Sequence, residues 1–170
     1  MKPLITLFLA AFLHVPLFSA QPNIVFILAD DMGYGDLGCY GHPVARTPNV
    51  DRLAQEGVLF TQHYANGPEC SPTRTALLTG RYQQRIGGLE CAIGTGNVGR
   101  YDDAIRLARG RELGLPVDQT VIPQALKKAG YVSGAFGKWH LGYEPAFNPM
   151  EYGWDEFFGY LGGNVHYLSL

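Results

Sequence analysis

The sequence is organised around one segment, CSPTRTALLTGR at residues 70–81. It predicts a helix, because Pro72 suits the first helical turn, where its missing N–H is no loss, and Gly80 suits the stop. Cys70 then lies at the helix N-terminus, where unpaired amides and the helix dipole favour negative charge. Arg74 follows one turn later and is expected on the same face of the helix. The segment therefore predicts a site for a tetrahedral oxyanion.

An apolar run, IVFILA at residues 24–29, precedes this helix and ends at Asp30 and Asp31. The run is short and β-branched at its start, which predicts a central parallel strand buried on both faces. Open α/β sheets place their ligands at the carboxyl ends of such strands. Adjacent carboxylates repel each other unless a cation compensates, and oxygen ligands suit Ca²⁺ or Mg²⁺. Asp30 and Asp31 are therefore candidate metal ligands, with a solvated turn as the alternative.

The rest of the chain alternates between strand and helix patterns. Helices are predicted at residues 47–57 and 120–130, and strands at residues 58–64 and 131–136. This alternation predicts the α/β class, with a mostly parallel sheet and helices on both of its faces. Right-handed crossovers would place the acidic pair and Cys70 along one edge of that sheet.

A glycine-flanked segment, GKWHLG at residues 137–142, follows the last predicted strand. In an extended segment Lys138 and His140 point the same way, because side chains alternate. A cation and an imidazole aimed at an anion site would neutralise charge and hydrogen-bond the nucleophile. The alternative is a surface lysine beside a buried structural histidine.

Three of these patterns together resemble one enzyme family. Cys-x-Pro-x-Arg followed by Leu-Thr-Gly-Arg is similar to the signature of the type I, formylglycine-dependent sulfatases, which are arylsulfatase-like members of the alkaline phosphatase-like superfamily. The acidic pair and the GKWHLG segment also match that family. The resemblance implies that a formylglycine-generating enzyme oxidises Cys70 to formylglycine. The hydrate of that aldehyde would attack a sulfate ester, with metal assistance, and release alcohol and sulfate.

The resemblance also assigns roles to single residues. It implies that Asp30, Asp31 and the modified Cys70 bind Ca²⁺, or Mg²⁺ in its place. It further implies that Arg74 steadies the formylglycine, that Lys138 bridges toward the sulfate, and that His140 hydrogen-bonds the hydrated aldehyde. The expected partner is a sulfated small molecule or glycan.

Later parts of the family pattern are not found in these residues. They are an Asp-Asn pair for the metal, a second histidine and a second lysine. We therefore expect residues 21–170 to be the N-terminal part of a sulfatase catalytic domain, poorly active alone. Two alternatives stay open: a phosphatase or phosphodiesterase of the same superfamily, which would ordinarily have Ser or Thr in place of Cys70, and an inactive secreted glycan-binding relative.

The net charge and the N-terminal residues indicate where the protein is located and which partners it can bind. Net charge is −2 and no basic stripe is present, which argues against a nucleic-acid partner. Residues 1–20 carry Lys2 and then a short apolar run, which predicts a signal peptide and a secreted or periplasmic protein without stable membrane insertion. Whether Cys39 and Cys91 pair is left open.

Three other segments carry further predictions. GYGDLG at residues 33–38 matches a dinucleotide-binding pattern, but the nearby acids would repel a pyrophosphate, so we reject that site. Residues 84–118 are expected to be an irregular excursion near the site. The aromatic-rich residues 144–170 are expected mainly to pack in the core, and Asn164 and His166 are candidates for substrate contact.

Overall fold

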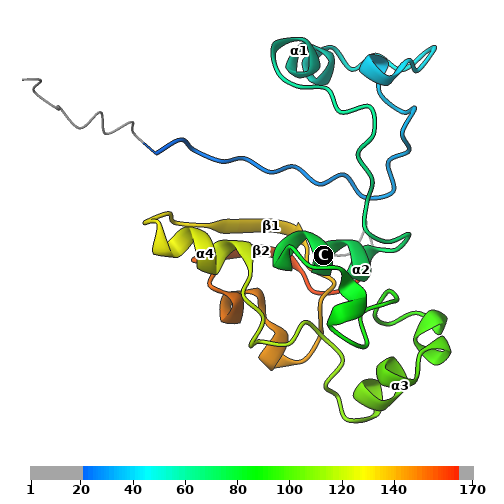
Figure 1. Ribbon diagram of the computed structural model, residues 1–170, viewed down its shortest axis with the longest axis vertical. Helices are drawn as coiled ribbons and strands as arrows, with labels where there is room; N and C mark the ends of the chain where they lie inside the picture. The colour runs from blue at the N-terminus through cyan, green and yellow to red at the C-terminus, as the bar shows by residue number, and fades with distance from the viewer. Residues whose placement is uncertain (1–20, 165–170) are drawn as a thin grey trace, which may run out of the picture. The chain divides into compact units, whose positions relative to one another are not determined.

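A computed structural model describes residues 21–164, and the chain divides into two units, Met1–Gly33 and Tyr34–Leu170 (Figure 1). The predicted signal peptide and His166 lie outside the described residues. No helix within the described range is long and apolar enough to cross a bilayer.

The described part of the first unit, residues 21–33, contains no helix or strand. The prediction of a strand at residues 24–29 is therefore wrong for this structure. The run is exposed, with Val25 and Ile27 both 83% accessible. An apolar run forms a strand only where the backbone of a neighbouring strand pairs with its own backbone. Residues 24–29 have no such strand pairing.

The helix predicted after Thr47 is confirmed as α1 (Pro48–Glu56), with proline in its first turn and Gly57 at its end. Thr47 does not cap α1 through its side chain. Its Oγ1 instead accepts from the Gly38 amide at 2.8 Å and donates to Asp51 Oδ1 at 2.8 Å. These bonds tie α1 to the short 3₁₀ turn η1 (Gly38–Tyr40), so the glycine-rich segment opens no α-helix.

The helix predicted around the cysteine motif is confirmed as α2 (Cys70–Thr79), which ends at Gly80 with φ +65°. Glycine adopts that left-handed conformation without steric cost. The later helix, α4 (Ile122–Lys128), begins after Val121 rather than at the predicted cap Thr120. The Val121 amide donates to Gln124 Oε1 at 3.3 Å, so the glutamine side chain satisfies the helix start.

A small parallel sheet follows, formed by β1 (Gly134–Lys138) and β2 (Glu156–Tyr160) side by side (Figure 1). β1 lies three residues later than the predicted start at 131, and β2 lies in the aromatic-rich segment for which only packing is predicted. The predicted strand at residues 58–64 does not form. The predicted α/β class is thus met in part, with parallel pairing but only two strands among residues 21–164.

Residues 84–118 are more regular than predicted. They contain α3 (Asp102–Arg109) and the 3₁₀ turn η3 (Gly96–Arg100), and η2 (Gln83–Arg85) begins just before them. Acidic residues lie in the first turn of α3 and arginines in its last, which complements the helix dipole. Two further 3₁₀ turns, η4 (Pro145–Phe147) and η5 (Pro149–Tyr152), precede β2.

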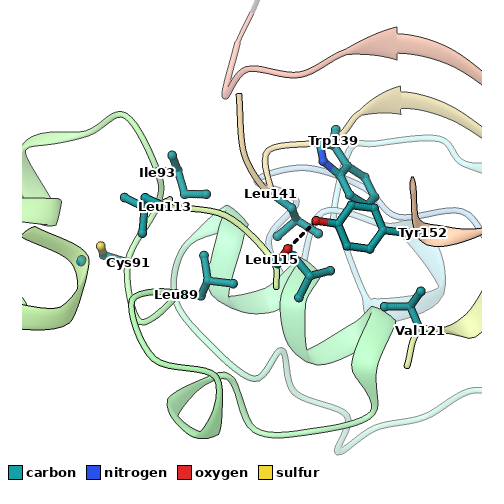
Figure 2. Packing of buried hydrophobic residues seen from close by; sticks show 10 residues of the cluster. Leu89, Cys91, Ile93, Leu113, Leu115, Val121, Trp139, Leu141 and Tyr152 are labelled. Atoms are coloured by element: carbon teal, nitrogen blue, oxygen red, sulfur yellow. Dashed lines mark hydrogen bonds between the residues drawn. The ribbon is translucent and has the colours of Figure 1, made fainter. Parts of the chain in front are cut away.

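The buried core of the second unit forms around the segment after β1 (Figure 2). Trp139 and Leu141 are both buried there, and the Trp139 ring packs 5.2 Å from that of Tyr152. The other members are Leu89, Cys91, Ile93, Ala104, Leu113, Leu115 and Val121. Trp139 and Leu141, two alternate residues after β1, therefore enter the core, which fixes the backbone of His140 between them.

Tyr152 provides a test of this core. Its ring is fully buried and its hydroxyl donates to the Leu115 carbonyl (Figure 2). Burial raises the pKa of Tyr152, so the hydroxyl keeps its proton in alkaline solution. Replacing Tyr152 by phenylalanine should lower the free energy of unfolding by about 1–3 kcal/mol, because the buried carbonyl loses its donor. Chemical denaturation of the two proteins measures this, and an unchanged value would contradict it.

Candidate active site

Cys70 and Lys138 meet although they are far apart in the sequence. Cys70 is the first residue of α2 and Lys138 the last of β1. The Lys138 ammonium donates to Cys70 Sγ at 2.9 Å. Both residues are partly buried. A positive charge therefore lies directly beside the sulfur, at the end of a helix that already favours negative charge.

Arg74 reaches the same place from one turn further along α2. Its guanidinium donates to the backbone carbonyl of Lys138 at 2.5 Å. Arg74 and Cys70 thus both contact Lys138, as expected for residues that share one helix face. The guanidinium joins α2 to the end of β1 and adds a second positive charge near the sulfur.

Ser71 connects the nucleophile segment to two others. It is fully buried, its Oγ donates to the His140 carbonyl at 2.7 Å, and the same oxygen accepts from the Ile93 amide at 3.1 Å. A buried hydroxyl that both donates and accepts is fully used and holds its neighbours in place.

His140 is 3% exposed, and its Nε2 lies 2.7 Å from the Ile93 carbonyl oxygen. A carbonyl can only accept, so Nε2 carries a proton in this arrangement. The predicted strand alternation does not extend to His140, because β1 ends at Lys138 and His140 has φ +57°. The sequence did not point to Gly163, where a Cβ would lie 2.7 Å from the His140 ring. Glycine there permits the loop to approach the imidazole closely.

Cys70, Arg74 and Lys138 belong to the second unit, and Asp30 and Asp31 belong to the first. Asp31 has φ +59°, a left-handed conformation that is uncommon for residues other than glycine. Within residues 21–164 no three Asp, Glu, His or Cys side chains are grouped so as to hold a metal ion. The donors themselves are carboxylate oxygens, which Ca²⁺ and Mg²⁺ prefer. The chemistry of the acidic pair therefore suits such an ion.

The three cysteines form no disulfide among the described residues, so Cys39 and Cys91 do not pair here. Cys91 is buried, and its pKa is raised by burial and by the nearby carboxylates of Glu69 and Glu90. It therefore stays a protonated thiol at neutral pH. Asn164 is exposed.

The arginines of residues 100–111 differ in their contacts. Arg106 pairs with Asp103 at 3.2 Å, with both side chains largely exposed. Arg111 pairs with Glu144 through two hydrogen bonds of 2.8 Å each. Both are surface pairs within the second unit, the commoner use of charged side chains.

Known proteins resemble this chain along most of its length. The sequence profile described as Sulfatase matches residues 22–168. N-acetylgalactosamine-6-sulfatase of Homo sapiens is 46% identical over 146 residues, which are 86% of this chain and 26% of that protein. Arylsulfatase A of Homo sapiens is 44% identical over 140 residues, covering 81% of this chain and 25% of that protein.

Solved structures agree with these matches. The crystal structure of Ps i-CgsB has a TM-score of 0.67 and 39% identity, covering 81% of this chain and 27% of that one. Its complex with k-i-k-neocarrahexaose has a TM-score of 0.65 and 38% identity, covering 79% and 27%. The chain spans about a quarter of the length of the curated relatives it matches.

Proposed function

The chain belongs to the sulfatase family, and from that premise we propose that it supplies the nucleophile and anion-binding groups of an enzyme that hydrolyses sulfate esters. One observation carries the proposal: the Lys138 ammonium lies 2.9 Å from Cys70 Sγ at the N-terminus of α2. An anionic substrate at this position would meet a ready positive charge.

We propose that Cys70 is oxidised to formylglycine by a formylglycine-generating enzyme before the chain folds. In the mature enzyme, oxygen would replace the Cys70 sulfur on the same carbon, as the aldehyde oxygen or as the two hydroxyls of its hydrate. Hydrated, the aldehyde supplies one hydroxyl that attacks sulfur and displaces the alcohol, and a second whose deprotonation expels sulfate. Overall, sulfate ester and water give alcohol and sulfate.

The surrounding side chains would serve this reaction by position and charge. Lys138 would neutralise sulfate oxygens as charge develops in the transition state. Arg74, fixed to the Lys138 carbonyl, would hold position 70 against β1. The proton on His140 Nε2 is directed to Ile93, which would orient the ring for a hydrogen bond to the hydrated aldehyde through its other nitrogen.

Asp30 and Asp31 would hold a Ca²⁺ ion, with Mg²⁺ as the alternative, because both supply hard carboxylate oxygens. Together with the modified Cys70, they would form the part of the metal shell that this chain provides. The ion would act there as a Lewis acid on the sulfate.

The proposed substrate class follows from the named relatives, and the proposed location follows from the N-terminal residues. One matching enzyme is named for N-acetylgalactosamine-6-sulfate chemistry, and one matching structure holds k-i-k-neocarrahexaose. We propose a sulfated glycan, or a smaller sulfate ester, as the substrate. The signal-like residues 1–20 support a secreted or periplasmic enzyme.

The first test is the mass of the tryptic peptide Leu53–Arg74, which contains Cys70. The protein is produced in cells that carry a formylglycine-generating enzyme. We expect a peptide mass that corresponds to replacement of the CH₂SH group by an aldehyde. Because the maturation reads a short linear motif, the change should not depend on the folded sheet.

A known sulfatase made in the same cells serves as the control. An intact thiol on Cys70, with the control sulfatase modified, would contradict the proposal and favour an inactive relative. A modified peptide together with hydrolysis of p-nitrophenyl phosphate but not p-nitrophenyl sulfate would favour a phosphatase.

A further inference from the structure

The residues on either side of Cys70 bind two consecutive amides of one distant segment. The Ala92 amide donates to Glu69 Oε2 at 2.5 Å, and the Ile93 amide donates to Ser71 Oγ at 3.1 Å. The backbone of residues 92 and 93 therefore contacts the side chains on both sides of the nucleophile. Nothing in the sequence motif around Cys70 points to this segment.

Glu69 makes a second bond to the same segment. Its Oε1 accepts from the Asn97 side-chain amide, so both carboxylate oxygens are used within residues 92–97. Glu69 occupies the N-cap position of α2, but its side chain makes no capping bond to that helix. A carboxylate beside a site for an anion would ordinarily repel the substrate. Here its oxygens are instead committed to the loop.

The loop held by Glu69 also controls the histidine. The Ile93 carbonyl lies 2.7 Å from His140 Nε2, and the Ile93 amide binds Ser71. Ser71 in turn donates to the His140 carbonyl. A shift of residues 92–93 would therefore move the His140 ring and the start of α2 together.

We propose that Glu69 and Asn97 form a clamp that positions the nucleophile, by fixing residues 92–97 against the N-terminus of α2. Glu69 is a positioning residue and takes no part in bond making. The catalytic consequence rests on the proposed sulfatase function. The clamp acts on kcat, because it sets the relation between position 70 and His140 rather than the contacts that bind substrate.

Three variants of the full-length protein test the clamp. In Asn97→Asp, two carboxylates face each other, and we expect kcat for p-nitrophenyl sulfate to fall about 30- to 100-fold, with KM within about twofold. In Glu69→Gln, the Asn97 side-chain amide can rotate so that its oxygen accepts from the new glutamine amide. The loss of kcat should therefore stay within about threefold. In the double variant, the new glutamine amide donates to the new aspartate carboxylate, and kcat should return to within about threefold of the unaltered protein.

Glu90→Gln is the matched control. Glu90 lies two residues before Ala92, and its Oε2 is buried with no hydrogen-bond partner among the described residues. Its substitution removes the same charge near the site but breaks no bond to α2, so kcat should change by less than about twofold. A large change of kcat in Glu90→Gln would mean that negative charge near the site, rather than the clamp, explains the loss in Asn97→Asp.

Formylglycine content is measured by peptide mass for each variant, so that maturation is not mistaken for catalysis. Asn97→Asp with the kcat of the unaltered protein at equal formylglycine content would overturn the proposal. A double variant no better than Asn97→Asp would overturn it as well, including the case in which Asn97→Asp folds poorly.

Hydrogen exchange separates the clamp from the reaction. In Asn97→Asp, which breaks the clamp, the Ala92 amide should exchange at least about tenfold faster than in the unaltered protein. In the double variant, which restores the pair, it should exchange at the rate of the unaltered protein. If the unaltered, modified protein does not turn over any sulfate ester, the proposed function fails, and exchange alone decides the clamp. If turnover is present and exchange is equal in all variants, the clamp is refuted while the function stands.

Discussion

Replacing Cys70 by alanine should reduce sulfate ester hydrolysis by at least about 10³-fold, because the variant can carry neither formylglycine nor any other nucleophile at position 70. The Lys138 ammonium, Arg74 and the helix N-terminus would remain, so substrate binding should fall much less. Initial rates with p-nitrophenyl sulfate and equilibrium binding of the same ester measure the two effects. Cys39→Ala, which alters a cysteine of the η1 turn, is the matched control and should keep its activity.

Cys70→Ser distinguishes the sulfatase from its closest chemical alternative. A serine has one hydroxyl, so after attack on sulfur no second hydroxyl on the same carbon can expel the sulfate. We expect at most one turnover and a sulfated peptide detectable by mass. Sustained turnover of a phosphate ester by Cys70→Ser would contradict the sulfatase assignment and indicate a phosphatase.

Replacing Lys138 by methionine should lower kcat/KM for the sulfate ester by about 10²- to 10³-fold. The Lys138 ammonium donates directly to the Cys70 sulfur, and methionine keeps much of the side-chain volume without the charge. Arginine should not restore activity, because its planar guanidinium cannot occupy the place of a compact ammonium. Steady-state kinetics on protein of equal formylglycine content measures both variants.

Lys128→Met is the control for Lys138. Lys128 lies in the last turn of α4, so its loss changes net charge equally. Its activity should stay within about twofold of the unaltered protein. Equal losses in the two variants would show that overall charge, rather than the contact with Cys70, governs the rate.

The helices α1, α2 and α4 were predictable from local signals, whereas α3 was not. Pro48 and Gly57 bound α1, and Gly80 ends α2, because proline and glycine act through their own backbone preferences. Such signals need no knowledge of distant residues. That Lys138 belongs to the site of Cys70 was expected from motif resemblance alone, and its contact with the Cys70 sulfur is seen only in the structure.

The strands and the supporting residues were harder to predict for a shared reason. A strand exists only where another backbone pairs with it, so the apolar run at 24–29 stays unpaired here while the unpredicted β2 forms. Glu69 was missed in the same way, since its partners lie at Ala92 and Asn97. The fold of residues 92–97 alone decides which hydrogen-bond donors reach the Glu69 carboxylate.

The bond from Arg74 to Lys138 ends on a carbonyl oxygen of the main chain. Every amino acid carries that oxygen, so mutation at position 138 leaves the arginine's anchor in place. The positive charge beside the nucleophile therefore depends on the side chain at position 138, whereas the attachment of α2 depends only on the main chain there. A lineage of such enzymes could exchange the lysine, and with it the preferred anion, while the scaffold that holds position 70 persisted unchanged.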